Sequence, residues 1–194
     1  MFNGIIYKTA KILKTEKTKS GLYLFLRSSL KITKKDIGSS FACNGACLTL
    51  LEHKKNVSKF YLSAETLKRT NFKYQKKNSV INLEKSLKYG QEIAGHFLTG
   101  HIDEISTIKS VKNYGQSKKF VIGANQKNLS LLIYKGSIGI NGVSLTINNF
   151  TKKNFEVLII PHTLNWTNLG ALKKGDHVNI EYDLVSKHFN KLKN

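Results

Sequence analysis

The chain contains one stretch of sequence twice. Residues 44–49 (NGACLT) return 97 positions later as residues 141–146 (NGVSLT). The same offset relates residues 65–67 to 162–164 and residues 80–84 to 177–181, and an offset of 96 relates residues 1–6 to 97–102. A period near 97 is longer than the roughly 20–50 residues of a solenoid unit. The pattern therefore indicates a duplicated domain, which can carry two similar pockets for two copies of one molecule.

Length and composition fit two small packed domains. The 194 residues divide into units of about 95, at the small end of the usual domain size. Hydrophobic residues make up 40% of the chain, enough to fill packed cores. No apolar run approaches the roughly 18–20 residues that cross a bilayer. Residues 1–6 (MFNGII) lack the basic region of a signal peptide. We therefore expect no membrane partner and a cytoplasmic location.

The net charge of +20 raises the question of a nucleic-acid partner, because polycations release counterions from a phosphate backbone. However, 30 of the 32 basic residues are lysine, and only Arg27 and Arg69 are arginine. The guanidinium fork that reads phosphates and base edges is thus nearly missing. The lysines are scattered from Lys8 to Lys193. This distribution favours a lysine-rich solvated surface and no specific nucleic-acid partner.

The two cysteines, Cys43 and Cys47, are expected to be free thiols. If residues 44–45 form a two-residue hairpin turn, the cysteines fall on opposite faces of the ribbon. In a single strand their Cα atoms would lie roughly 13 Å apart, beyond the ~7 Å limit for a disulfide. No matching Cys and His set indicates zinc, so we expect no metal site. Free thiols fit a reducing compartment.

Each half reads as short strands separated by turns, which predicts an all-β fold. The Asn-Gly pairs at 44–45 and 141–142 are strong hairpin signals. Five β-prone runs occur in each half, at residues 23–26, 40–43, 47–51, 60–62 and 79–83 and at residues 119–122, 137–140, 144–147, 155–160 and 177–181. About six strands in under 100 residues favour closure, which removes exposed edges. We predict two tandem six-stranded Greek-key-like closed barrels with a C-terminal α-helix.

Helices are few. Short ones are predicted at residues 126–134, after a cap at Asn125, and at residues 64–70. The clearest follows Asp183, a good N-cap, because apolar residues recur there at helical spacing, at Leu184, Val185, His188, Phe189 and Leu192. That stripe packs either on its own barrel or on the same helix of another subunit.

We therefore divide the chain into three parts. Residues 1–96 form the first barrel, residues 97–183 the second, and residues 184–194 the C-terminal helix and tail. The junction near residues 95–97 (GHF) has no Pro- or Ser-rich linker.

Six blocks, taken together, resemble riboflavin synthase, the α-type enzyme built from two lumazine-binding barrels. The resemblance runs from Met1 to about His188 in family order. The blocks are residues 1–6 (MFNGII), 44–49 (NGACLT), 65–67 (ETL), 95–103 (GHFLTGHID), 135–136 (KG) and 160–164 (IPHTL). Asn3, where the family often has Thr, and Cys43, where Val or His is common, are minor departures.

The resemblance implies an activity and an assembly. The chain would dismutate two molecules of 6,7-dimethyl-8-ribityllumazine, passing a four-carbon unit from one to the other. The products would be riboflavin and 5-amino-6-ribitylaminouracil, and neither a cofactor nor a metal would be needed. The family is a homotrimer in which the first barrel of one subunit faces the second barrel of its neighbour. The stripe at residues 184–192 suits the helical contact of such a trimer.

Differences between the two halves indicate the catalytic residues. The repeat matches Cys47 with Ser144, Ile5 with His101, Glu65 with His162, and Ser86 with Asp183, so the second half carries a histidine and an acid that the first half lacks at those places. We expect His101 to transfer protons and Ser144 to orient or activate a nucleophile. Cys47 would act in the first pocket, and Asp183 would orient a neighbour or a water. Taken alone, His101 is more simply a structural histidine and Cys47 a small core residue. His96, at the junction, is either structural or near the site.

The resemblance also implies a set of substrate contacts, repeated in the two halves. Glycines would let a flat ring approach the backbone, while hydroxyl and polar groups would hold the ribityl chain. In the first half the set is Gly4, Ile5, Ile6, Cys47, Leu48, Thr49, Tyr61, Leu62, Ser63, Ala64, Glu65 and Thr66. In the second half it is Gly100, His101, Ile102, Lys135, Ser144, Leu145, Thr146, Leu158, Ile159, Ile160, Pro161, His162 and Thr163.

Two alternatives stay open. One is a non-catalytic protein of the same fold that binds lumazine or flavin. Such paralogues tend to lose one pocket, whereas both halves here keep the Asn-Gly-x-x-Leu-Thr and x-Thr-Leu blocks. The other is a basic barrel that binds nucleic acid through aromatic side chains, but the aromatic residues here occur at strand spacing and fit a core.

Overall fold

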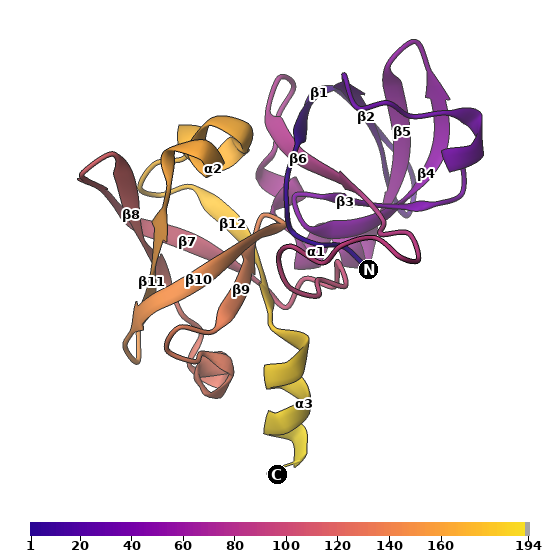
Figure 1. The fold of residues 1–194 in the computed structure, drawn as a ribbon. Helices are drawn as coiled ribbons and strands as arrows, with labels where there is room; N and C mark the ends of the chain where they lie inside the picture. The colour runs from indigo at the N-terminus through magenta and orange to yellow at the C-terminus, as the bar shows by residue number, and fades with distance from the viewer. Residues whose placement is uncertain (193–194) are drawn as a thin grey trace.

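The computed structural model describes residues 1–192 and shows two closed six-stranded barrels side by side, followed by a helix (Figure 1). The strand order around the first barrel is β1-β2-β5-β4-β3-β6, and the second has the same order built from its own strands. Neighbouring strands are antiparallel throughout. This confirms the predicted all-β, duplicated-barrel fold. Residues 193 and 194, the end of the expected tail, lie outside the described residues.

Each barrel consists of six strands and one short α-helix. Barrel 1 contains β1 (Lys8–Lys17), β2 (Gly21–Ser28), β3 (Ser40–Cys43), β4 (Ala46–Lys54), β5 (Val57–Ser63), α1 (Ala64–Arg69) and β6 (Val80–Lys85). Barrel 2 contains β7 (Glu104–Tyr114), β8 (Ser117–Gly123), β9 (Ser137–Ile140), β10 (Val143–Phe150), β11 (Asn154–Ile159), α2 (Pro161–Trp166) and β12 (His177–Tyr182). The C-terminal helix α3 spans Leu184–Leu192, and short 3₁₀ helices lie at Lys34–Asp36, Asn71–Tyr74, Gln126–Leu131 and Asn168–Ala171. None of these helices is long and apolar enough to cross a bilayer.

Both Asn-Gly pairs form the predicted hairpin turns. The φ angles are 46° at Asn44 and 80° at Gly45, and 47° at Asn141 and 77° at Gly142. Two successive positive φ angles define the tight turn whose twist matches the flanking strands. The two turns meet, because a Cβ added to Gly45 would lie 2.7 Å from the backbone nitrogen of Gly142.

The two cysteines lie on either side of the first of these turns. Cys43 and Cys47 are both free, as predicted, with Cys43 buried and Cys47 partly exposed. Burial raises the pKa of the Cys43 thiol, which keeps it protonated and unreactive.

The first strand of each barrel was not predicted, although β1 and β7 are the longest strands at 10 and 11 residues. Lysine, serine and threonine interrupt their apolar pattern. In addition, the register shifts between Ile12 and Lys14 in β1 and between Ile108 and Ser110 in β7. Such a β-bulge breaks the period-two alternation on which a strand prediction depends.

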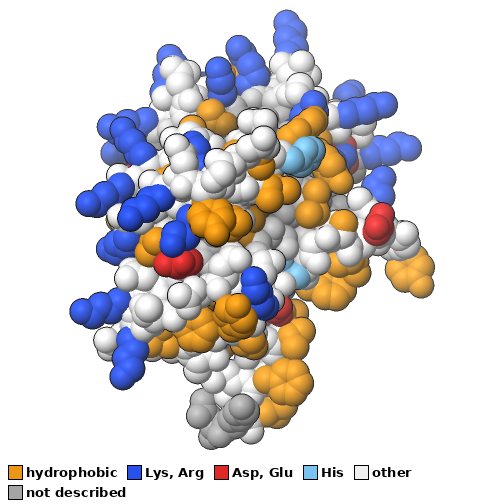
Figure 2. Space-filling view, turned by 60° about the vertical axis from the view of Figure 1, so that its left-hand side comes forward, with side chains coloured by type: hydrophobic (Ala, Val, Ile, Leu, Met, Phe, Trp, Pro, Cys, Tyr) orange, Lys and Arg blue, Asp and Glu red, His pale blue; other side chains and the backbone are white. Residues whose placement is uncertain are grey.

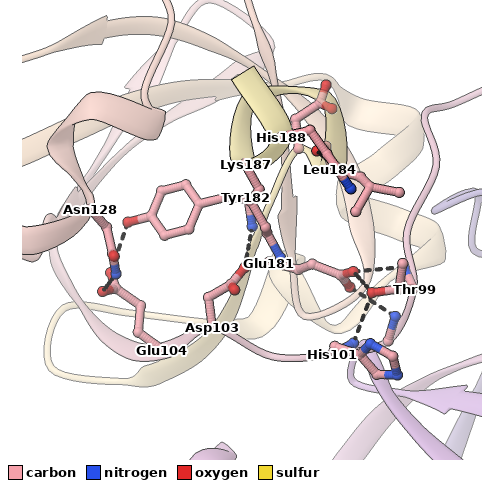
Figure 3. A network of polar contacts seen from close by, with 12 residues as sticks. Thr99, His101, Asp103, Glu104, Asn128, Glu181, Tyr182, Leu184, Lys187 and His188 are labelled. Carbon is pink, nitrogen blue, oxygen red and sulfur yellow. Dashed lines mark hydrogen bonds and ion pairs between the residues drawn. The ribbon is translucent and has the colours of Figure 1, made fainter. Parts of the chain in front are cut away.

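The C-terminal helix begins where the sequence predicts. The Asp183 carboxylate accepts a hydrogen bond from the backbone N–H of Val185 at 2.8 Å, as an N-cap does. The helix projects from barrel 2 (Figure 1) and is anchored by Lys187, which pairs with Asp103 at 2.6 Å (Figure 3). The segment after Asn125 is shorter than expected, since its 3₁₀ helix ends at Leu131.

The segments that lead into the two barrels are exchanged between them. Ile6, from the start of the first half, lies in the core of barrel 2, whereas Ile102, from the start of the second half, packs against the core of barrel 1. Phe2 and Leu98 pair as an isolated antiparallel bridge and form a small buried cluster with Ala42. Each barrel is therefore completed by residues from the other half of the sequence.

Buried asparagines join the barrels through matching hydrogen bonds. The Asn82 amide donates to the Asn141 carbonyl at 3.0 Å, and its repeat partner Asn179 donates to the Asn44 carbonyl at 2.8 Å. The backbone N–H of Asn168 donates to the Asn82 side chain at 2.7 Å, and that of Asn71 donates to the Asn179 side chain at 2.6 Å. We call these six residues the asparagine network; they obey the internal twofold of the duplication.

Two glutamates hold the exchanged segments in place. Glu84 in β6 accepts hydrogen bonds from the backbone N–H groups of Asn3 at 2.7 Å and Gly4 at 3.1 Å. Its repeat partner Glu181 accepts from those of Thr99 at 2.6 Å and Gly100 at 3.0 Å (Figure 3). Burial raises the pKa of Glu84 to about 7, because desolvation exceeds the opposing effect of the two N–H groups and the N-terminal ammonium.

Replacing Asn82 by alanine is expected to lower the free energy of unfolding by about 2–4 kcal/mol. The change would leave the Asn168 N–H and the Asn141 carbonyl buried and unpaired, at roughly 1–3 kcal/mol each. Asn179→Ala is expected to cost a similar amount, because it removes the equivalent pair of bonds. Urea unfolding measures both, with the exposed Asn113→Ala as control within about 0.5 kcal/mol of wild type. A loss at Asn82 no larger than at Asn113 would contradict the role of the network.

The raised pKa of Glu84 predicts a pH dependence of stability. Between its ordinary value of 4.5 and about 7, the folded protein holds a proton that the unfolded chain releases. The free energy of unfolding therefore falls as pH rises through this window, by up to about 1.4 kcal/mol per pH unit. Glu84→Gln is expected to flatten that slope in urea unfolding across the window. The exposed Glu92→Gln should keep the wild-type slope, and an unchanged slope in Glu84→Gln would refute the assignment.

Candidate active site

The exchange of leading segments builds two equivalent clusters around Cys47 and Ser144. The backbone N–H of Cys47 in β4 donates to the Gly100 carbonyl at 2.8 Å, and that of Ser144 in β10 donates to the Gly4 carbonyl at 2.9 Å. Both glycines have positive φ, and a Cβ added to Gly100 would lie 2.5 Å from the Cys47 Cβ. Only glycine permits this approach at both places.

The clusters lie on the outside of the barrels, whose interiors are filled. Leu48 and Leu50 point into the core of barrel 1, while Cys47 is partly exposed and Thr49 exposed. Alternation along β4 therefore places Cys47 and Thr49 together on its outer face. In β10 the same alternation brings Ser144 and Thr146 to the outer face of barrel 2. A flat ring would bind against these faces and not inside a barrel.

The barrel-1 pocket has a volume of about 210 Å³ and gathers Cys47, Glu65 and Thr66 from the contacts predicted in the first half. Its lining residues are Ala46, Cys47, Glu65, Thr66, Arg69, Thr70, Gly100, His101 and Ile102. Ser63 caps α1 by accepting from the Thr66 N–H at 3.1 Å. Glu65 pairs with Arg69 at 2.7 Å across one helical turn, which lowers the pKa of the Glu65 carboxyl through the hydrogen bond from Arg69.

His101 therefore lies with Cys47 and not with Ser144. The sequence repeat matches His101 with Ile5, and the sequence analysis paired the histidine with neither Cys47 nor Ser144. The crossing of segments brings His101 to the Cys47 pocket of barrel 1, whereas Ile5 lines a separate hollow with Leu83 and Glu84. Arg69 is a lining residue that the sequence analysis missed. The signal was its position four residues after Glu65 on a helix, the spacing of an ion pair.

The barrel-2 cluster has Ser144 in the place of Cys47. The Ser144 Oγ lies 2.6 Å from the His96 Nδ1. Burial lowers the pKa of His96, while the charge of Asp183 acts in the opposite direction. The internal twofold relates His162 and Thr163 of α2 to Ser144 as Glu65 and Thr66 of α1 are related to Cys47. His162 is exposed and stacks on Trp166 at 5.7 Å between centroids.

Several predicted contact residues are buried and can offer only their backbone. Leu48 and Leu62 fill barrel 1, and Ile6 and Ile159 fill barrel 2. The remaining members are partly or fully exposed, at Ile5, Tyr61, Ala64, Leu145, Leu158, Ile160 and Pro161. The Tyr61 hydroxyl is 2.8 Å from the Ser20 hydroxyl.

Lys135 lies apart from the residues around Ser144. Its backbone N–H donates to the Ile147 carbonyl at 2.9 Å, three residues along β10 from Ser144. Its ammonium lies over the ring of Tyr134 at 5.5 Å from the centroid. Neither of these contacts joins the Lys135 side chain to the Cys47 cluster or to the Ser144 cluster of its own chain.

Among residues 1–192, no group of three or more His, Cys, Asp or Glu side chains is arranged to hold a metal ion. The two clusters instead offer a thiol, hydroxyl groups, imidazoles and backbone groups beside glycines. Such groups can hold a flat heterocycle and donate hydrogen bonds to it, and an imidazole can move a proton.

Comparison with known proteins gives a consistent result. The lumazine binding domain family matches the chain twice, over residues 3–86 and 99–183. Riboflavin synthase from Actinobacillus pleuropneumoniae is 36% identical over 188 residues, covering 97% of this chain and 87% of the relative. Riboflavin synthase from Brucella abortus (strain 2308) is 34% identical over 193 residues, covering 97% of this chain and 96% of the relative.

A solved structure shows the same fold. LumP complexed with 6,7-dimethyl-8-(1'-D-ribityl) lumazine matches with a TM-score of 0.80 and 25% identity, covering 93% of this chain and 98% of LumP. The two barrels, their paired clusters and the full-length relatives agree, and the chain therefore belongs to the riboflavin synthase family, with two lumazine-binding domains.

Proposed function

We propose that this chain is a riboflavin synthase, a transferase that dismutates two molecules of 6,7-dimethyl-8-ribityllumazine. A four-carbon unit passes between them, and the products are riboflavin and 5-amino-6-ribitylaminouracil. The observation that carries the proposal is the pair of matched clusters, in which Cys47 and Ser144 each donate a backbone N–H to a glycine carbonyl of the exchanged segment. Identical substrates that take different roles require two similar but unequal sites.

The chemistry fits a protein without a cofactor or a metal. The methyl group next to the conjugated lumazine ring is acidic, because the ring accepts the electron pair when the C–H bond breaks. Holding two rings in near-attack geometry supplies part of the rate, on the order of the ~7–11 kcal/mol seen for well-oriented intramolecular reactions. The side chains therefore need only to orient the two rings and to move protons, and thiol, hydroxyl and imidazole groups can do both. We expect this enzyme to work in the cytoplasm.

The roles divide between the clusters. In the barrel-1 pocket, His101 moves a proton and Cys47 contacts the ring, with Glu65 and Thr66 toward the ribityl hydroxyls. In barrel 2, Ser144 orients the reacting group, and His162 and Thr163 take the ribityl chain. Burial lowers the pKa of His96, and Asp183 acts on this histidine through its charge, which opposes that shift.

A homotrimer would bring unlike clusters together. Each cluster lies on the outer face of its own barrel, and Phe2 and Leu98 are buried where the two leading segments pair, so we propose that two rings meet across subunits and not within one chain. Contact between barrel 1 of one subunit and barrel 2 of the next would allow this. The exposed apolar stripe of α3 suits the contact, because Val185, Phe189 and Leu192 are 56%, 63% and 83% exposed. The substrate contact expected of Lys135, whose ammonium lies over Tyr134 in its own chain, would then fall in a site of the neighbouring subunit.

The main alternative is a protein that binds lumazine without turning it over, since LumP shares the fold. The catalytic proposal is favoured because the full-length relatives are riboflavin synthases and because both clusters are retained. A nucleic-acid role has less support. Lysine and arginine side chains spread over the face in Figure 2 with hydrophobic side chains among them, and they form no continuous strip.

Purified protein incubated with 6,7-dimethyl-8-ribityllumazine is expected to produce riboflavin, one per two lumazines consumed, by flavin absorbance. His101→Gln is expected to lower kcat about 10- to 100-fold, because it removes a group that transfers protons. General acid–base catalysis by a side chain typically contributes about 10²–10⁴-fold to the rate. His53→Gln, a histidine of β4 outside both clusters, should keep the wild-type rate. Tight lumazine binding without riboflavin would favour the binding protein, and a wild-type rate in His101→Gln would remove His101 from the mechanism.

Phe189→Asp is expected to dissociate the assembly, because it places a charge in the apolar stripe of α3. Light scattering after size exclusion should show a trimer for wild type and a monomer for the variant, and riboflavin formation should fall at least about tenfold as the facing sites separate. Lys191→Asp introduces the same charge at an exposed position of the same helix and should stay trimeric. A monomeric wild-type protein with full activity would reject the trimer.

A further inference from the structure

The contact of His96 with Ser144 belongs to one of the two clusters. His96 belongs to the connection between the two copies, and its Nδ1 lies 2.6 Å from the Ser144 Oγ. The segment after the second copy forms α3, which projects away from the barrels (Figure 1). The duplication therefore provides Ser144, but not Cys47, with an imidazole from this connection. This is a chemical asymmetry between the clusters that comes from the connection and not from a difference within the repeat.

The connection is held tightly against Ser144. The backbone N–H of Gly95 donates to the Asn3 side chain at 2.7 Å, and the Asn3 amide donates to the Glu92 carbonyl at 3.3 Å. A Cβ added to Gly95 would lie 2.0 Å from the Asn3 carbonyl oxygen and 3.0 Å from the Ser144 Cβ. The contact between His96 and Ser144 is thus fixed by the fold.

The surroundings of the His96 Nε2 atom indicate whether His96 or Ser144 donates the hydrogen bond between them. Burial lowers the pKa of His96, so the ring is neutral near pH 7 and carries one N–H. Within the described part of the chain, the His96 Nε2 is buried and has no hydrogen-bond partner. A buried N–H without a partner is rarer than a buried lone pair without one. Placing the proton on Nδ1, as a donor to the Ser144 oxygen 2.6 Å away, leaves Nε2 with a lone pair and not with an unpartnered N–H.

We infer that His96 is a positioning residue that turns the Ser144 hydroxyl into a hydrogen-bond donor facing the lumazine of the barrel-2 cluster. Because the Ser144 oxygen accepts from His96, its own O–H is free to point at the ligand. The inference rests on the proposed function and adds to it a division of labour: barrel 2 stabilises the lumazine that loses its methyl proton.

The step balances without a further reactant. The methyl C–H bond breaks, its electron pair spreads over the lumazine ring, and the proton passes to water. Ser144 keeps its own proton and donates a hydrogen bond to the anionic ring, which a neighbouring donor strengthens. When the anion takes up a deuteron from D₂O, the methyl group becomes labelled.

Deuterium exchange of this methyl group, followed by NMR with bound 6,7-dimethyl-8-ribityllumazine in D₂O, tests the inference. His96→Leu is expected to slow exchange and kcat about 10- to 100-fold, as loss of an orienting neighbour does, with KM within about twofold of wild type. His96→Asn is expected to restore both to within about fivefold of wild type, because its amide keeps an N–H donor near the place of Nδ1.

A matched pair provides the control. His53 Nδ1 lies 3.0 Å from the Ser58 Oγ, away from both clusters, and His53→Leu and His53→Asn should leave exchange and kcat unchanged. Wild-type exchange in His96→Leu would overturn the inference, as would His96→Asn being as slow as His96→Leu while remaining folded by urea unfolding. Exchange is read whether or not riboflavin forms, so absence of riboflavin with the wild-type protein tests the proposed function separately.

Discussion

The asparagine network holds the two barrels together and sets the geometry of both clusters. Four of its six buried side-chain amides, those of Asn82, Asn141, Asn168 and Asn179, both donate and accept hydrogen bonds. The Asn-Gly turns meet there because Gly45 and Gly142 have no side chains. A buried amide that loses its partner costs more than a hydrogen bond gains. The network therefore fixes the angle between the barrels more strictly than apolar packing alone would, since apolar contacts are not directional.

This fixed angle makes the exchange of segments possible. Glu84 and Glu181 each bind two backbone N–H groups of a leading segment, while the carbonyl of Gly4 or Gly100 binds the opposite barrel. Each segment is thus shared by both barrels. A shift between the barrels would separate Gly4 from Ser144 and Gly100 from Cys47. The geometry of both clusters therefore depends on the twofold interface.

The asymmetry between the clusters arises from chain continuity. Duplication copies the barrel but not the segment after it. Beyond the first copy the chain must reach the second, and this connection passes Ser144 and supplies His96. Beyond the second copy the chain is free to form α3, whose apolar side chains are exposed. One reaction with two identical substrates needs such a difference, and here it results from the order of the copies.

The duplication, the two closed barrels, both Asn-Gly turns, the free cysteines and the start of α3 are all predictable from the sequence alone. They depend on residues near one another in the chain, whose turn and strand preferences are local. The strands β1 and β7 were missed, because a bulge in each breaks the alternation that marks a strand. The candidate site residues were taken from the two halves separately, and the pairing of His101 with Cys47 was not predicted. The tertiary fold alone settles that pairing, because hydrogen bonds between segments more than 50 residues apart, such as Cys47 with Gly100, leave no periodic pattern in the sequence.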